Sequence, residues 1–119
     1  MKFMVSLITD GTGMEGMTAE ERQEYGAKMG AFMGEIQSAG ILADPGAALG
    51  PASDARTLRR KSGKAVVTDG PFAESKEQLA GYMVLECAGL DEAVSWVEKM
   101  PVAGGAIEVR PIREQPSGG

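Results

Sequence analysis

One loop in the middle of the chain combines residue types that suit both a tight turn and acid–base chemistry. It reads Asp69-Gly70-Pro71-Phe72. Gly accepts a positive φ, Pro keeps the residue before it out of the helical region, and Asp can accept hydrogen bonds from amides two residues ahead. The loop is therefore either a rigid turn or the site of a functional carboxylate, and both interpretations of Asp69 stay open.

The chain contains no His and a single Cys among its 119 residues. This excludes Ser-His-Asp triads, Cys-His nucleophile pairs and internal disulfides, and it argues against zinc. We therefore expect neither a metal nor a cofactor, and we expect any acid–base work to use Asp, Glu, Tyr or Lys. Asp69 is the candidate catalytic residue, because desolvation raises the pKa of an Asp toward the range of a general base.

The composition is typical of one globular domain, with 43% hydrophobic and 24% charged residues. We expect a single domain over residues 1–113 and a flexible tail over residues 114–119. The net charge of −5 argues against nucleic acid or an anionic membrane as a partner, because both attract cationic surfaces. There is no apolar run long enough to span a bilayer and no signal-peptide pattern, so a cytoplasmic location is expected.

A long amphipathic helix is predicted after residue 18. Its start is the capping box Thr18-Ala19-Glu20-Glu21, and its stop is Gly40, a typical C-terminal residue. Apolar residues recur between them every three or four positions. Three glycines at intervals of four (Gly26, Gly30 and Gly34) line one side of the helix, where they either admit another backbone or lie on an indifferent surface.

Alternating apolar residues predict the strands. The remaining elements, in chain order, are strand 2–8, a short strand from 41, hairpin strands 57–61 and 64–68, strand 81–87, helix 90–100 and strand 106–113. Residues 44–55 are expected to form a loop. The order indicates an α+β fold of the ferredoxin-like βαββαβ type, in which two helices cover one face of an antiparallel sheet. The basic hairpin tip indicates a solvated surface, with a phosphate contact as the alternative.

The sheet face away from the helices carries the residues that suit binding. Strand alternation predicts that Ser6, Tyr82, Glu86, Glu108 and Arg110 lie there among apolar neighbours. A solvated face would be more polar, and a core face would lack these charges. We therefore expect the sheet to meet a second copy of itself around a polar-lined cavity. Arg110 either binds a carboxylate or phenolate ligand or pairs with a neighbouring Glu.

The loop is expected to join that site. Asp69 would lie at the mouth of the cavity as a general base or ligand acceptor. Phe72 takes its direction from the preceding turn, and we expect it to anchor the loop in the core and to line the ligand site.

The loop and the segments that follow it carry a family resemblance. The segments that match are Asp69–Leu79, Gly81-Tyr82, Leu90-Asp91-Glu92-Ala93 and Ile107-Glu108-Val109-Arg110-Pro111. They resemble the DGPF group of YCII-related proteins, and the resemblance covers nearly the whole chain. It implies that two ferredoxin-like units pair as a dimeric α/β barrel.

The resemblance implies three kinds of function. In the wider group an enzymatic role has been argued around a His–Asp pair, and some members act on chlorinated aromatic compounds. This chain has no His, so only Asp69 can match that pair. Some relatives are linked to sigma factors of the extracytoplasmic type. We therefore predict a homodimeric small-molecule-binding domain. The alternatives are an enzyme that uses Asp69 on a small aromatic or carbonyl substrate, and an interaction module associated with a sigma factor.

Overall fold

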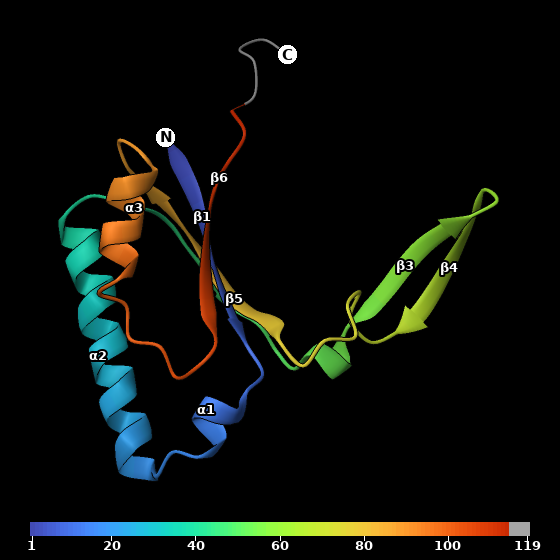
Figure 1. The fold of residues 1–119 in the computed structure, drawn as a ribbon, viewed down its shortest axis with the longest axis horizontal. Coiled ribbons are helices and arrows are strands. Elements are labelled where there is room, and N and C mark those ends of the chain that lie inside the picture. The colour runs from blue at the N-terminus through green and yellow to red at the C-terminus, as the bar shows by residue number, and fades with distance from the viewer. Residues whose placement is uncertain (115–119) are drawn as a thin grey trace.

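The computed structural model describes residues 1–114, which form a sheet with helices on one side and a separate hairpin on the other (Figure 1). The strands are β1 (Lys2–Thr9), β2 (Leu42–Ala48), β3 (Arg56–Lys61), β4 (Lys64–Asp69), β5 (Gln78–Glu86) and β6 (Ala106–Pro111). The helices are α1 (Thr12–Glu15), α2 (Ala19–Ser38) and α3 (Leu90–Val97), with a 3-10 turn, η1, at Ala52–Asp54. The fold is α+β, as predicted.

Four strands form one antiparallel sheet in the order β2-β5-β1-β6. The inner strand β1 sets the register, with Val5 opposite Met83 of β5 and opposite Val109 of β6. Strand β6 lies at an edge and ends at Pro111. Proline has no amide hydrogen, and an edge strand tolerates it. The edge position predicted from Pro111 is therefore confirmed.

Helix α2 begins at the predicted capping box. The hydroxyl of Thr18 accepts a hydrogen bond from the Glu21 amide at 3.1 Å, and the Glu21 carboxylate accepts one from the Thr18 amide at 3.2 Å. The helix is followed by Gly40 with a φ of 74°, the left-handed conformation that glycine favours after a C-cap. Helices α2 and α3 lie on the same side of the sheet (Figure 1).

The core lies between these helices and one sheet face. Phe3 and Leu85 from the sheet and Ile36 from α2 are fully buried, and Ala93 and Val97 of α3 join them. These strand residues are on the face that alternation assigned to the helices. The sequence therefore predicted correctly which side of each central strand is covered.

Residues 44–55, predicted as a loop, instead begin with most of strand β2. This strand pairs with β5 through two register shifts around Asp44 and Ala47. Gly46 has a φ of 65°, and a Cβ there would lie 1.8 Å from the carbonyl oxygen of Tyr82. The irregular pairing depends on this glycine. Pro45 and Gly46 hid the strand because both residues are uncommon within regular strands.

The predicted hairpin forms, but outside the four-stranded sheet. Within residues 1–114, β3 and β4 pair with each other as a separate two-stranded sheet. Their turn places Ser62 and Gly63 at φ values of 51° and 80°, and positive values at both positions define a type I′ hairpin turn. Strand β2 occupies the sheet edge, so the hairpin adds two strands that the four-stranded sheet does not contain.

Two further sequence-based expectations concern the C-terminal tail and the absence of a membrane span. The predicted flexible tail, apart from Glu114, lies outside them. In residues 1–114 we find no helix of the length and apolar character that crossing a membrane requires.

Candidate functional site

Within residues 1–114, no helix or strand covers the sheet face opposite the helices. We call its side chains the open face; they are Met4, Ser6, Tyr82, Val84, Glu86, Glu108 and Arg110. The contrast along one strand is clear, because Met83 on the helix side is 7% exposed and Tyr82 beside it is 37% exposed. Helices α2 and α3 lie on the other side of the sheet (Figure 1).

Strand register brings most of the predicted ligand-binding residues together. Ser6 lies opposite Tyr82 on β5 and opposite Glu108 on β6, and Met4 lies opposite Arg110. Ser6 is 7% exposed because it is a small residue between larger neighbours. The centre of the open face therefore combines a hydroxyl, a phenol, a carboxylate and apolar side chains.

Two ion pairs lie on this face. A guanidinium nitrogen of Arg110 is 2.7 Å from a carboxylate oxygen of Glu108, which is the pairing alternative that the sequence left open. The Arg110 side chain remains 72% exposed. Glu86 lies apart from them near the end of β5, 3.8 Å from the N-terminal amino group. Because the Arg110 side chain is mostly exposed, its guanidinium keeps hydrogen-bond donors available for an anionic ligand.

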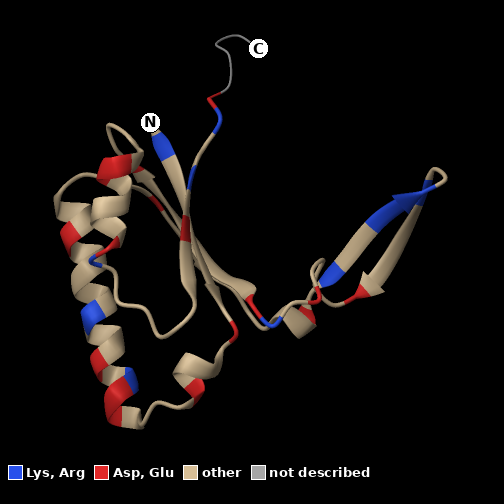
Figure 2. Cartoon of the chain, viewed as in Figure 1, with Lys and Arg blue, Asp and Glu red and all other residues tan. Residues whose placement is uncertain are grey.

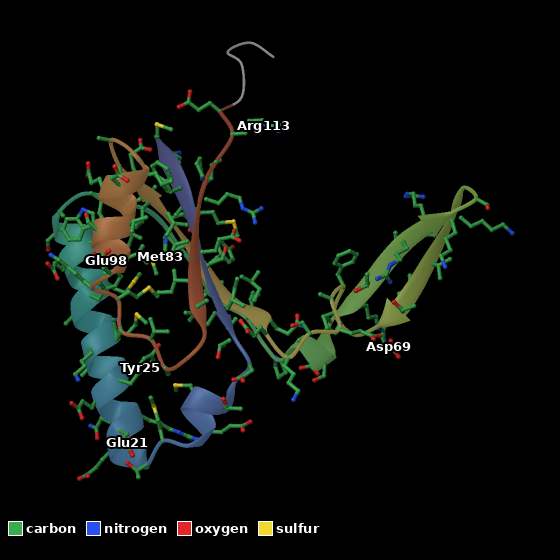
Figure 3. All side chains as sticks on the ribbon, viewed as in Figure 1. Glu21, Tyr25, Asp69, Met83, Glu98 and Arg113 are labelled. Atoms are coloured by element: carbon green, nitrogen blue, oxygen red, sulfur yellow. The ribbon has the colours of Figure 1, made fainter. Side chains whose placement is uncertain are left out.

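Asp69 is not beside the open face within one chain. It ends β4 at the foot of the hairpin, well away from Met83 in the sheet (Figure 3). Its carboxylate lies 3.5 Å from Arg56 Nε, and its side chain is 92% exposed. A carboxylate that acts as a general base is best placed in a site shielded from solvent, and one chain does not shield this one. The catalytic role of Asp69 stays a prediction that depends on other molecules covering it.

Phe72 also differs from the expectation for it. It does not anchor the loop in the core, since it is 75% exposed, and the Arg59 guanidinium lies 5.2 Å from its ring centroid. The loop is held instead by the start of β3. The Gly70 amide donates to the Ala55 carbonyl at 2.7 Å, and the Thr57 hydroxyl donates to the Gly70 carbonyl at 2.9 Å. These bonds make the loop the foot of the hairpin.

A cleft with a mixed polar and apolar lining, which the sequence did not predict, lies where the hairpin joins the sheet. It has a volume of about 510 Å³ and is lined by the ends of β1, β2 and β5, including Asp10, Lys76 and Gln78. Asp10 accepts hydrogen bonds from the hydroxyl and amide of Thr12 at 2.6 and 2.9 Å. These bonds, chiefly the one from the Thr12 hydroxyl, lower the pKa of Asp10, and the charge of Lys76 adds to the effect. The Asp-Gly-Thr turn after the first strand was the available signal.

A second cavity lies on the helix side. It has a volume of about 250 Å³ and lies between Met29 and Met33 of α2 and the strands β1, β2 and β5. Its lining is mostly apolar, which suits an apolar group. The methionines at helical spacing were the signal, because flexible Met side chains fill irregular space loosely.

Within residues 1–114, no group of three or more Asp, Glu, Cys or His side chains is arranged to hold a metal ion. The candidate site is the open face, and the cleft of mixed lining lies where the hairpin leaves the sheet. The chemistry it offers is hydrogen bonding, one cationic group and apolar contact.

Comparison with known proteins gives two matches that bear on the family of this chain. Residues 1–115 match the YCII-related domain. The chain is also 36% identical over 115 residues to an uncharacterized protein of Rhizobium meliloti (strain 1021), a match that covers 94% of this chain and 92% of that protein. Both matches span nearly the whole chain. The chain therefore belongs to the family of YCII-related domain proteins.

Proposed function

We propose that the protein is a homodimeric small-molecule-binding domain, in which two copies meet through their open faces around a polar-lined cavity. The observation that carries the proposal is the mixture of side chains on a sheet face with no cover. Met4 and Val84 are half-buried apolar residues, and Glu108 and Arg110 are charged. A cavity between two such faces would keep the apolar groups from water while the charged groups retain solvent or ligand contacts.

The strand arrangement supports this assembly. When α1 and the hairpin are set aside, the order β1, α2, β2, β5, α3, β6 and the sheet order β2-β5-β1-β6 agree with a ferredoxin-like plan. We propose that plan as the unit of the dimer, and pairing of two units as a dimeric α/β barrel. A two-fold axis would place the same patch of both copies in contact.

The ligand class that fits best is a small aromatic carboxylate. The Arg110 guanidinium can form paired hydrogen bonds to a carboxylate, and the Tyr82 ring and the Met4 side chain offer apolar contact to an aromatic ring. The enzymatic alternative receives no support from the position of Asp69 in a single chain, because its carboxylate is exposed and paired with Arg56.

Light scattering and thermal unfolding test the proposal. At micromolar concentration we expect the mass of a dimer, and we expect a panel of aromatic carboxylates to raise the melting temperature. Arg110→Gln should remove the ligand-induced rise. Lys28→Gln is the matched control, since it removes one cation from an exposed pair with Glu24 on α2. A monomer, or a ligand response that survives Arg110→Gln, would refute the corresponding part of the proposal.

A further inference from the structure

The hairpin β3–β4 exposes apolar side chains on both of its faces. Leu58 and Val67 are opposite each other on one face and are 55% and 56% exposed. Val66 and Phe72 are exposed on the side of Arg59, at 39% and 75%. Apolar groups on both faces are unusual for a hairpin that stays in water, since a solvated face would be polar. Both faces of the hairpin therefore have apolar contact area that the described part of the chain leaves exposed.

The low stability expected of an isolated hairpin also indicates that this hairpin contacts another surface. A lone two-stranded hairpin is marginally stable in water and needs a further strand, helix or sheet against it. Here the hairpin extends from the body (Figure 1), and the radius of gyration is 16.9 Å. A compact chain of this length would have about 13–14 Å. The hairpin is therefore expected to gain its order from a surface outside this chain.

The direction of the hairpin identifies which surface is within reach. It projects on the side of the sheet opposite α2 and α3, which is the side of the open face (Figure 1). Two sheets that pack face to face are about 10 Å apart, and six-residue strands are about 20 Å long. A second copy seated on the open face would therefore lie within the length of the hairpin.

Charge favours a second copy of this chain as the occupant. Residues 56–69 contain five basic residues and one acidic residue, which gives this segment a net charge of +4. Because the whole chain has a net charge of −5, the remaining residues have a net charge of −9. Figure 2 shows blue segments on both hairpin strands and most of the acidic residues on the body. Two hairpins repel each other, whereas a hairpin and the body of another copy attract.

We propose that the hairpin of each chain packs against the body of its partner at the rim of the partner's open face. Each hairpin would then bring Arg59 and Phe72 to the cavity of the other chain, with Asp69 at its margin. The cavity would be completed in trans, and the ligand would touch residues from both chains. This inference rests on the dimer of the proposed function and adds to it a contact that a dimer formed by the sheets alone would lack.

Hydrogen exchange of the full chain at several concentrations tests the contact directly. Light scattering on the same samples gives the fraction of dimer. We expect amides of β3 and β4 to be protected at least about tenfold more in the dimer than in the dilute monomer, because the isolated hairpin opens readily. If the sample is a dimer and the hairpin amides exchange as fast as in the monomer, the inference fails while the proposed dimer stands. If the sample is monomeric at every concentration, both fail.

A pair of matched variants locates the contact. Leu58→Thr with Val67→Thr keeps strand-forming residues and removes apolar surface from one face of the hairpin. The control is Leu90→Thr with Val102→Thr, which removes similar groups, 45% and 40% exposed, on and just after α3. Burial of Leu and Val predicts a loss of dimer affinity of at least about tenfold for the hairpin variant and little change for the control.

Other occupants of the hairpin would appear as different results. Equal dimer affinity for the two variants and the wild type would overturn the proposal. Protection of the hairpin that depends on added polyphosphate and not on protein concentration would also overturn it, and would favour an anionic partner for the basic tip.

Discussion

The two sides of this molecule contain apolar residues in similar alternating patterns, yet only one side is packed. On the helix side Phe3 and Leu85 of the sheet and Ile36 of α2 are fully buried between the helices and the sheet. On the other side Tyr82, Leu58 and Phe72 remain exposed on the open face and the hairpin. The difference shows that the helix side carries the stability of the single chain. The other side has apolar surface in excess of what one chain can cover, which is typical of an interaction site.

The largest expected effect contrasts one leucine from each side. Leu85→Ala removes a fully buried side chain and should lower the free energy of unfolding by about 2–5 kcal/mol. Leu58→Ala makes the same change at a residue that is 55% exposed and should cost less than about 0.5 kcal/mol in the monomer. Urea unfolding at low protein concentration measures both values. A larger cost for Leu58→Ala that grows with protein concentration would mean that the hairpin is buried between chains.

The second effect concerns the irregular edge strand. Gly46→Ala puts a Cβ against the Tyr82 carbonyl at a φ of 65°, so we expect a loss of more than about 2 kcal/mol. Gly50→Ala is a suitable control, because a Cβ there meets no atom within 4 Å. Thermal unfolding compares the two. Equal melting temperatures would show that β2 does not depend on this glycine.

A smaller effect of opposite sign is expected on the outer side of α2. A Cβ added at Gly26, Gly30 or Gly34 meets open space, so no other backbone segment within residues 1–114 approaches them. Gly30→Ala should therefore raise the free energy of unfolding by up to about 1 kcal/mol. A destabilising effect of this substitution, or a weaker dimer, would indicate that another chain packs against the outer side of α2 instead of the open face.

The smallest effects are those of titration. Burial raises the pKa of the Cys87 thiol, with the charge of Glu92 as a further cause, so the thiol should react slowly with alkylating reagents until the protein unfolds.

The lowered pKa of Asp10 means that its contribution to stability is present above its unfolded pKa and is lost as the pH falls through the lower folded value. Asp10→Ala should flatten acid unfolding slightly below pH 4. An unchanged acid limb would show that the bonds to Thr12 add nothing to stability.

The sequence predicted several elements of the fold correctly. The capping box and the Gly40 stop define α2, and Ser62-Gly63 defines the hairpin turn. These succeed because a cap or a turn is decided by residues within a few positions of one another. Strand β2 was mostly missed because its pairing with β5 overrides the local preference of Pro45 and Gly46.

The candidate site was predictable only in part. Alternation grouped Ser6, Tyr82, Glu108 and Arg110 on one face, and the register brings them together there. Neither the exposure of Phe72 nor the position of Asp69 beside Arg56 followed from the loop sequence. Both depend on where the hairpin goes after it leaves the sheet, and no periodicity carries that information.

The sequence by itself determined which residues face each side of the sheet, where α2 begins and ends, and that no imidazole is available for catalysis. Only the tertiary structure decided that the hairpin leaves the sheet, that its foot is the Asp69–Phe72 loop, and that one sheet face has no cover. The reason is physical. Alternation and capping arise from backbone geometry over a few residues, whereas the covering of a surface depends on contacts between segments that are far apart in the chain.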